Sequence, residues 1–415
     1  MRLLWMCPLV VCLCAGQTLT LDAALEMAAR QNPGVQVARL RVLEREALAV
    51  AAKAAYLPQA DLVVSTTYQT SNLQGIGLAF PGFDGRIGPY RTFNARPVVT
   101  QKLLDFTLLS SIRAARLQTA AARLDMEAAR EEIQAAVITL YLQSFQAQSR
   151  VRAGRARLSV ADALLAQVAD REKGGASSQL DVARNRQQRE SEQVALLAAE
   201  QELALLRPAL AELLGGPVEG ELAEPKLRLA TESGQRFDVR AAEARVRVAE
   251  QEAERARKER WPKLTASGDY GVLGAGPDRS TSTYAVGATL QIPLWTSGRL
   301  EAEQRAARQR VAQGKEEMRR LSLQAERQAA QARVAYAIQQ QLAEAAAASA
   351  EEARRVLALA RLRYEAGMAT AVDTVTAQGA LAQAEDTEIR ARYETSIALA
   401  RLAFAQGAVK GALAP

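Results

Sequence analysis

The chain contains no histidine, few aromatic residues, and only three cysteines, which all fall within the first 14 positions. Without histidine, zinc-type sites and His-based catalytic triads are excluded, and a chain cleaved after residue 16 would also lack thiol chemistry. No phosphate-binding loop or dinucleotide fingerprint precedes a predicted helix. These absences predict that the protein is not an enzyme and that it has neither a metal site nor a cofactor.

Proline is missing from two long stretches, one between Pro97 and Pro208 and the other between Pro293 and Pro415. Because a proline inside a helix costs about 3 kcal/mol, both stretches are free to form long helices. They are rich in alanine, arginine, glutamate, glutamine and leucine, a composition typical of long helices packed side by side. Aromatic residues make up 5% of the chain against 49% apolar residues overall, so a wide globular core would be poorly filled.

The formal charge of +7 does not indicate a nucleic-acid partner. The 53 basic residues are interspersed with 46 acidic ones along the same segments. No basic block with interleaved aromatic residues, of the kind that a nucleic-acid groove needs, is present. We interpret the charges as the solvated faces of helices.

The first sixteen residues are typical of an export signal. Arg2 is followed by an apolar run over residues 3–13 and by small residues that suit cleavage before Gln17. The run is too short to cross a bilayer as a helix. Lipidation at Cys14 is a further possibility, although Leu13 stands where a lipoprotein signal normally has a small residue.

The rest of the chain is a duplicated unit. Pro33–Ala38 matches Phe237–Ala242 at a shift of 204 residues, and Arg113–Arg116 matches Arg305–Arg308 at a shift of 192. The first repeat therefore has twelve extra residues. We place them in a loop over residues 71–91, which is rich in glycine and proline.

Segments with period-two alternation flank these loops and predict four strands of about ten residues. The alternating apolar positions in the second repeat are Leu264, Ala266, Gly268, Tyr270 and Val272, then Tyr284, Val286, Ala288, Leu290, Ile292 and Leu294. The first repeat has similar segments over residues 62–68 and 93–104. This pattern fits a strand of a membrane barrel and a soluble hairpin buried on one face equally well.

Two very long helices are expected, over residues 108–172 and 300–365, each reaching roughly 100 Å. Glycine-containing turns follow them, and return helices begin after the N-caps Ser178 and Thr370. Apolar residues at spacings of four and seven predict packing between helices; they include Val137, Tyr141, Phe145, Val334, Ile338 and Leu342.

The predicted order of elements follows from these segments. Residues 207–236, with Pro208, interrupt the helical pattern and contain the bridge between the repeats. The predicted divisions are a signal peptide (1–16), a first helix (17–57), a strand pair with an extracellular loop (58–105), a long helix with tip turn and return helix (106–214), a linker (215–236), a first helix (237–261), a strand pair with loop (262–296), a second long helix with tip turn and return helix (297–407) and a tail (408–415).

Four strands cannot form a closed barrel alone. An open sheet edge in hydrocarbon leaves backbone groups unpaired at several kcal/mol each, so strands that face lipid occur in closed barrels. A chain with four such strands would therefore need strands from partner copies to close a barrel. The predicted fold class is an α+β membrane protein with internal duplication.

The duplicated chain resembles the TolC-type outer-membrane efflux family over essentially its whole length after the signal. The matching segments are Leu19–Leu25 with Asn32-Pro33, Arg236–Glu243, Ala256–Pro262, Leu290–Gly298, and Arg363–Gly367 with Asp373. Phe237 stands where the family often has proline. The resemblance implies a homotrimer with a twelve-stranded β-barrel in the lipid of the outer membrane and an α-helical barrel through the periplasm. It also implies an exit duct for a tripartite efflux pump or a type I secretion system, with a periplasmic adaptor and an inner-membrane transporter as partners.

The resemblance also implies roles for residues near the two tip turns. Asp181 and Asp373 would lie at the constriction together with Thr376, which occupies a position where some members have a second carboxylate. Arg171, Arg363 and Tyr364 would link neighbouring coils. The tips, where the adaptor would make contact, would be formed by Gly174, Gly175, Ser178, Gly367, Met368 and Thr370. Without the resemblance, both aspartates are explained as helix caps, and the glycines as turn residues.

Two other functions remain open from the residues alone. A periplasmic helical-hairpin adaptor of the same machine would share the long helices, but not two pairs of amphipathic strands. A cytosolic scaffold that binds nucleic acid would require the natural start to lie beyond the export signal.

Overall fold

The computed structural model describes residues 18–78, 81–82, 84–175, 177–218, 220–225, 234–366 and 368–407. The predicted signal peptide with Cys14, the tail and Gly367 lie outside the described residues. The chain divides into two compact units. Unit 1 comprises Met1–Leu40, Leu124–Arg240 and Arg320–Pro415, and unit 2 comprises Arg41–Arg123 and Ala241–Arg319.

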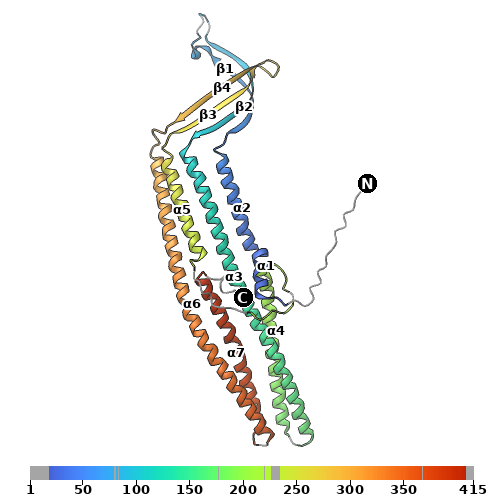
Figure 1. Cartoon of the computed structure of the whole chain (residues 1–415). Helices are drawn as coiled ribbons and strands as arrows, with labels where there is room; N and C mark the ends of the chain where they lie inside the picture. The colour runs from blue at the N-terminus through green and yellow to red at the C-terminus, as the bar shows by residue number, and fades with distance from the viewer. Residues whose placement is uncertain are drawn as a thin grey trace, which may run out of the picture. The chain divides into compact units, whose positions relative to one another are not determined.

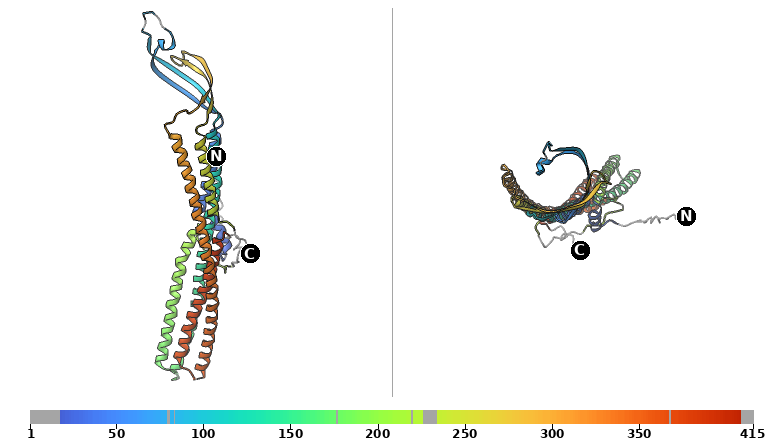
Figure 2. Two further views of the ribbon diagram at one scale, coloured as in Figure 1. Left: turned by 90° about the vertical axis from the view of Figure 1, so that its left-hand side faces the viewer. Right: turned by 90° about the horizontal axis from the view of Figure 1, so that it is seen from above.

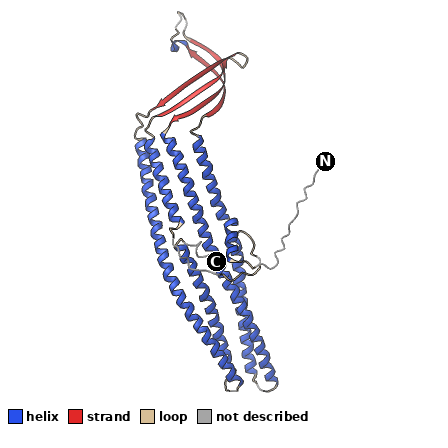
Figure 3. Ribbon diagram, in the orientation of Figure 1, coloured by secondary structure: helices blue, strands red, loops and turns tan. Residues whose placement is uncertain are grey.

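Unit 2 contains one antiparallel sheet in the order β1-β2-β3-β4, drawn in red in Figure 3. Its strands are β1 (Gln59–Asn72), β2 (Arg86–Leu104), β3 (Lys263–Gly274) and β4 (Ser280–Gln291). Seen from above, the sheet is curved (Figure 2). The structure confirms two pairs of strands, but these are longer than predicted, with 14, 19, 12 and 12 residues.

The predicted loop over residues 71–91 is too long. β1 continues to Asn72 and β2 already begins at Arg86, so only residues 73–85 connect them, including the 3-10 helix η1 (Leu73–Ile76). The glycine and proline residues misled the prediction, because Gly88 and Pro89 lie inside β2 near its start. Pro89 is tolerated because it lies, with Gly88, at the irregularity where the pairing of β2 with β1 changes register between Tyr90 and Ile87.

The strand registers separate the sheet into an apolar face and a polar face. On the apolar face Leu62 lies opposite Pro97, Val64 opposite Ala95, Tyr270 opposite Tyr284, and Leu264 opposite Leu290. These side chains are not covered within the chain, since Leu62 is 72% exposed and Val286 is 83% exposed. The polar face carries the alternate residues, for example Ser65 opposite Asn94 and Thr265 opposite Thr289.

Seven α-helices are present in the part of the chain that the structure describes (Figure 1). They are α1 (Leu21–Gln31), α2 (Pro33–Ala54), α3 (Phe106–Lys173), α4 (Gln179–Leu214), α5 (Phe237–Lys258), α6 (Arg299–Glu365) and α7 (Ala371–Ala405). The two long helices are confirmed, with 68 residues in α3 and 67 in α6. α3 begins where the carboxylate of Asp105 accepts hydrogen bonds from the N–H groups of Thr107 and Leu108, each at 3.0 Å.

The first predicted helix, over residues 17–57, is in fact two helices. The backbone of Asn32 is extended, with φ −60° and ψ 125°, because a residue before proline is disfavoured in the helical region. The Asn32 side chain accepts hydrogen bonds from the N–H groups of Gly34 and Val35, at 2.8 and 3.2 Å, and donates one to the carbonyl of Leu213 at 2.8 Å. It therefore starts α2 and ties this start to the end of α4.

Pro208 does not interrupt the return helix: the structure agrees with the predicted division, which ends this helix at residue 214, and not with the interpretation of residues 207–236 as an interruption. It lies inside α4, which continues to Leu214 and ends at Gly215 with a left-handed φ of 77°. Leu210 and Leu214 are both fully buried beyond the proline. Burial of two leucines contributes about 3–6 kcal/mol, which offsets the roughly 3 kcal/mol cost of the proline.

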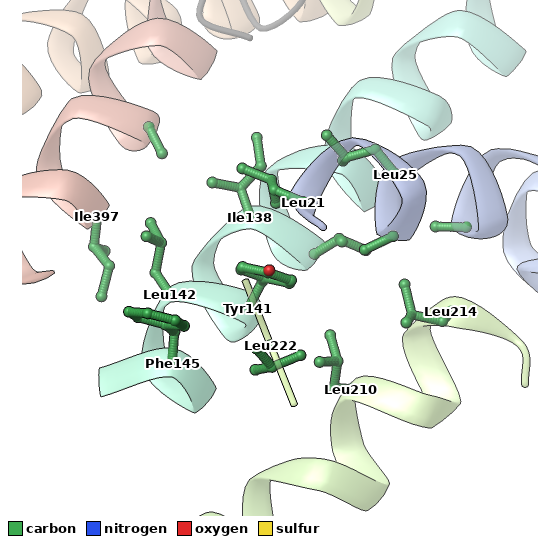
Figure 4. Close-up of a cluster of buried hydrophobic side chains, with 14 of the residues drawn as sticks. Leu21, Leu25, Ile138, Tyr141, Leu142, Phe145, Leu210, Leu214, Leu222 and Ile397 are labelled. Carbon is green, nitrogen blue, oxygen red and sulfur yellow. The ribbon is translucent and has the colours of Figure 1, made fainter. Parts of the chain in front are cut away.

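The main core of unit 1 joins α1, α3, α4 and α7 (Figure 4). Tyr141 is fully buried at its centre, and its hydroxyl shares its one proton between the carbonyl oxygens of Leu19, at 2.6 Å, and Ala223, at 2.7 Å. Leu19 and Leu222 form an isolated parallel bridge. The Gln148 side chain also pairs with both backbone groups of Leu222, at 3.0 and 3.1 Å. The segments before α1 and after α4 are thereby held on α3.

The apolar stripes have different outcomes on the two long helices. Val137, Tyr141 and Phe145 of α3 are buried as predicted. Val334 and Ile338 of α6 are 61% and 51% exposed. The single chain therefore leaves the α6 stripe uncovered, and its packing against another helix stays a prediction.

Candidate functional site

Two helix–turn–helix ends lie at the same end of unit 1 (Figure 1). We name them tip 1 (residues 170–184, from α3 to α4) and tip 2 (residues 363–376, from α6 to α7). In tip 1, Gly174 and Gly175 donate backbone hydrogen bonds to Asp170 and Glu172, and Gly175 has a left-handed φ of 73°. A side chain at Gly175 would be strained, so this glycine is required by the turn.

Asp181 closes tip 1 through a reciprocal cap. Its N–H donates to the hydroxyl of Ser178 at 3.1 Å, while its carboxylate accepts from the Ser178 N–H at 3.3 Å and from the Ser178 hydroxyl at 2.7 Å. Arg184, one turn later, lies 3.9 Å from the other carboxylate oxygen. The predicted N-cap Ser178 is confirmed, and the negative charge of Asp181 lies at the helix N-terminus, where it is favourable.

Asp373 has the equivalent position in tip 2. Its carboxylate accepts from the N–H and the hydroxyl of Thr370, both at 2.9 Å. These hydrogen bonds and the positive charge of Arg363 lower the pKa of Asp373. Thr376 lies one turn further, where its hydroxyl donates to the carbonyl of Val372 at 2.8 Å. On the α7 side of the turn, tip 2 therefore presents one carboxylate, that of Asp373, held ionised, and Thr376 one turn later is not a second one.

The structure brings two of the three predicted link residues together. The guanidinium of Arg171 in α3 lies 5.5 Å from the ring centroid of Tyr364 in α6, within cation–π range. Arg363 acts on Asp373 within its own tip. Met368 is 68% exposed near Thr370, so an apolar side chain projects from tip 2.

Sequence reasoning missed a charged cluster further along the same helices. Asp386 of α7 lies 3.4 Å from the guanidinium groups of both Arg150 and Arg157 in α3. Arg157 also pairs with Glu192 of α4 at 3.2 Å, and these two side chains are 16% and 10% exposed. The cluster therefore joins three helices with little access to water. The seven-residue spacing of the two arginines was the available signal, but arginine is too frequent here for spacing to single them out.

A second missed cluster lies on the polar face of the sheet. Arg96 of β2 donates to Asn94 at 2.6 Å, to Asp269 of β3 at 2.7 Å, and to Thr283 of β4 at 3.3 Å. Gly271 leaves the room that Arg96 occupies, since a Cβ at this glycine would lie 2.3 Å from the Arg96 Cβ. The cluster ties three strands together across the polar face.

Neither a metal site nor a membrane-spanning helix was found in the parts of the chain that the structure describes. No group of three or more Cys, Asp or Glu side chains is placed to hold a metal ion there. No described helix combines the length and the apolar character needed to cross a bilayer.

An antiparallel sheet with an uncovered apolar face and two unpaired edges, encoded together with paired long helices, is the architecture expected of an outer-membrane efflux channel protein. This class does not depend on any single residue at the tips. It follows from the alternation of the strands and from the duplicated helix–turn–helix ends.

The chain belongs to the outer membrane efflux protein family. The sequence model of that family matches residues 24–216 and 231–408, which include both repeats. The suspected resemblance is thereby confirmed. The protein is an efflux protein of the outer membrane, and its family is not an enzyme class.

Curated relatives and solved structures agree with this assignment. The pyoverdine export outer membrane protein OpmQ of Pseudomonas putida is 28% identical over 398 residues, covering 91% of this chain and 84% of the relative. The protein of the same name from Pseudomonas aeruginosa is 26% identical over 416 residues, with the same coverage. The outer membrane protein VceC of Vibrio cholerae has a similar fold, with a TM-score of 0.77 at 22% identity over 93% of this chain and 96% of that one. The Campylobacter jejuni CmeC outer membrane channel gives 0.79 at 17% identity, over 94% of this chain and 86% of that one.

Proposed function

We propose that three copies of this chain assemble into a gated exit duct, with a twelve-stranded β-barrel in the outer membrane and a helical barrel through the periplasm. The duct serves a tripartite efflux pump or a type I secretion system passively. A periplasmic adaptor contacts the duct, and an inner-membrane transporter supplies the energy for export. The observation that carries the proposal is the four-stranded sheet with an uncovered apolar face and two free edges.

The free edges require other copies in lipid. β1 and β4 each have a neighbour on one side only, so a row of backbone N–H and C=O groups on each strand has no partner in the sheet. Each such group costs several kcal/mol in hydrocarbon. Closing the sheet with strands of identical copies removes this cost without any other protein.

The uncovered stripe on α6 supports the same assembly in unit 1. Val334 and Ile338 repeat at a spacing of four residues, and each is more than half exposed in the single chain. α4 carries a second uncovered set, with Val194 at 67% and Leu205 at 69%. Contact between copies would cover both sets and provide the packing that the sequence predicts for the α6 stripe.

Tryptophans mark the end of the sheet next to the helices. Trp295 is 86% exposed and Leu294 is 92% exposed just after β4, while Trp261 stacks edge-on against Phe106 with ring centroids 4.7 Å apart. Tryptophan is enriched at membrane–water interfaces. We assign this end of the sheet to the periplasmic surface of the outer membrane.

The tips form the gate and the adaptor contact in this proposal. Asp181, Asp373 and Thr376 would surround the constriction, and a ring of ionised carboxylates there attracts cations. Arg171, Arg363 and Tyr364 would hold the two coils in the closed arrangement. The exposed Met368, with Gly174, Gly175, Ser178, Gly367 and Thr370 around the turns, would meet the adaptor.

The proposal includes no catalytic step and no cofactor, in keeping with a chain that lacks histidine. Selection of the cargo would rest with the transporter. Pyoverdine, which the two curated relatives export by name, is a cargo to test here. The adaptor alternative fails to explain the paired amphipathic strands and the match to the efflux family.

Two measurements test the proposal together: the native mass of the purified protein and its channel conductance in planar bilayers. The full chain, purified from outer membranes in detergent, should have the native mass of three copies and should form cation-selective channels in planar bilayers. A stable monomer that forms no channels would refute it. Restored pyoverdine export in a strain that lacks its own duct would identify the cargo.

A further inference from the structure

The two hairpins of the sheet are copies of each other, and their registers define how they correspond. β1 begins its pairing with β2 at Gln59 opposite Thr100, and β3 begins its pairing with β4 at Lys263 opposite Gln291. β1 therefore corresponds to β3 at a shift of 204, and β2 corresponds to β4 at a shift of 191. The helices that follow correspond at 192.

The pairing of β2 with β3 changes register between Lys102 and Leu104, where β2 contains one additional residue. The β2–β3 pairs used below, from Ala95 to Val99, all lie before this irregularity, in the part of β2 to which the shift of 191 applies. On the apolar face, the shift of 191 also matches residues of similar character: Phe93 corresponds to Tyr284, and Val99 corresponds to Leu290.

The pairing of β2 with β3 is the place within the chain where the first repeat meets the second. Its register places Val99 opposite Gly268, Val98 opposite Asp269, and Ala95 opposite Val272. In an assembly of identical copies, the second repeat of one chain must meet the first repeat of the next. The corresponding strands are then β4 of one copy and β1 of its neighbour, which are the two free edges.

We infer that β4 pairs antiparallel with β1 of a second copy in the register that the internal β2–β3 pairing defines. Applying the two shifts places Leu290 opposite Val64 of the neighbour and Thr289 opposite Ser65. The same operation places Val286 opposite Tyr68. This inference rests on the proposed trimer and specifies its interface residue by residue.

The deduced register keeps the two faces of the sheet intact. Val286, Leu290, Val64 and Tyr68 all belong to the apolar face, while Thr289 and Ser65 belong to the polar face. A slip by one residue would place apolar side chains against polar ones on both faces, because side chains alternate with a period of two. A slip by two residues would preserve the faces, so it is the alternative that an experiment must separate.

The chain suits a disulfide test, because its cysteines are confined to positions 7, 12 and 14, within the predicted signal. Two double variants probe the deduced register, S65C with T289C and V64C with L290C. Using adjacent pairs covers both kinds of antiparallel site, whose Cα separations differ. The matched controls represent slips of two residues in either direction, S65C with Q291C and S65C with G287C.

Oxidation of the protein in outer membranes should give covalent trimers on non-reducing gels. We expect at least one deduced pair to link about tenfold faster than both controls, since a slip by two residues moves the sulfur atoms out of bonding range. Faster linking of a control pair would overturn the register. A native trimer in which no pair links would overturn edge pairing altogether. A native mass of one copy would instead refute the proposed function, and the inference with it.

Discussion

The glycine at position 271 gives the sharpest test of how the sheet is built. Replacing Gly271 by alanine would place a Cβ 2.4 Å from the carbonyl oxygen of Ala95 and 2.6 Å from the Cα of Arg96. Both are backbone atoms, so a side-chain rotation cannot relieve the contact. β2 and β3 would have to separate locally by about 1 Å, at a cost typical of overpacking, about 1–3 kcal/mol per copy. The separation would also stretch the ion pair between Arg96 and Asp269.

Two other glycines in the same hairpin provide controls. A Cβ at Gly287 would meet nothing within 4 Å, and one at Gly268 would lie 3.7 Å from a methyl group of Val286. Alanine at these positions should leave the free energy of unfolding unchanged or raise it by about 0.4–1 kcal/mol, because it restricts the unfolded chain.

Denaturation in detergent micelles, followed by tryptophan fluorescence, measures the effect. Trp261 and Trp295 are the only tryptophans beyond position 5, and both lie next to the sheet. The Gly271→Ala variant should unfold at a clearly lower denaturant concentration than the wild type, whereas the Gly287→Ala variant should not. If both variants unfold with the wild type, the close approach of β2 and β3 at Gly271 is wrong.

The remaining predictions concern unit 1. Asp373→Ala should raise the closed-state conductance or lower the cation selectivity in planar bilayers. The control Thr370→Ala removes a hydroxyl donor but keeps the charge of Asp373, so it should leave the selectivity unchanged. Equal effects of the two substitutions would assign Asp373 to helix capping alone. The pKa of Asp373 is lowered, so its charge and the capping stability that depends on this charge are fully present above the ordinary value of 3.8. Both are lost only as the pH falls through the lowered pKa. The selectivity should therefore be the same at pH 5 and pH 7. Tyr141→Phe leaves two buried carbonyls without their donor, so it should lower the free energy of unfolding, measured by chemical denaturation, by about 1–3 kcal/mol and speed proteolysis near Leu19. Unchanged protection from the protease would contradict the role of Tyr141 in holding the segments at Leu19 and Ala223. Asp386→Ala should destabilise unit 1 by about 1–3 kcal/mol. This is less than the effect of breaking a fully buried ion pair, because the partners of Asp386 are partly exposed. The surface control Glu190→Gln should change the stability by under about 0.5 kcal/mol.

Features set by neighbouring residues could be predicted from the sequence. The Ser178 cap was predictable because the serine and Asp181 are three residues apart and satisfy each other. The four strands were predictable because alternation is a local pattern. The break at Asn32 was available from the proline that follows it, and treating residues 17–57 as one helix ignored that restriction.

Features set by distant residues could not be predicted in this way. Pro208 was expected to interrupt its helix, and only the burial of Leu210 and Leu214 explains why it does not. Arg96 and Asp269 lie far apart in the sequence, and the cross-strand register alone brings them together. The exposure of the α6 stripe likewise depends on which surfaces one chain can cover by itself.

The hydrogen bonds that Tyr141 and Gln148 make to the segments at Leu19 and Leu222 limit where the chain can be cut into two halves. Leu222 lies in the sequence between the repeats, yet it is 3% exposed in the core formed by α1, α3, α4 and α7. A gene fragment that stops at Leu214 would therefore leave a hole beside Tyr141 and would leave the Gln148 side chain without the Leu222 backbone groups that it binds. During synthesis, the segment at Leu19 must likewise wait for Leu222 before its bridge can form. The smallest first half that could fold by itself extends at least to Ala223, and the two duplicated halves cannot be exchanged at the helix end without carrying this short connection along.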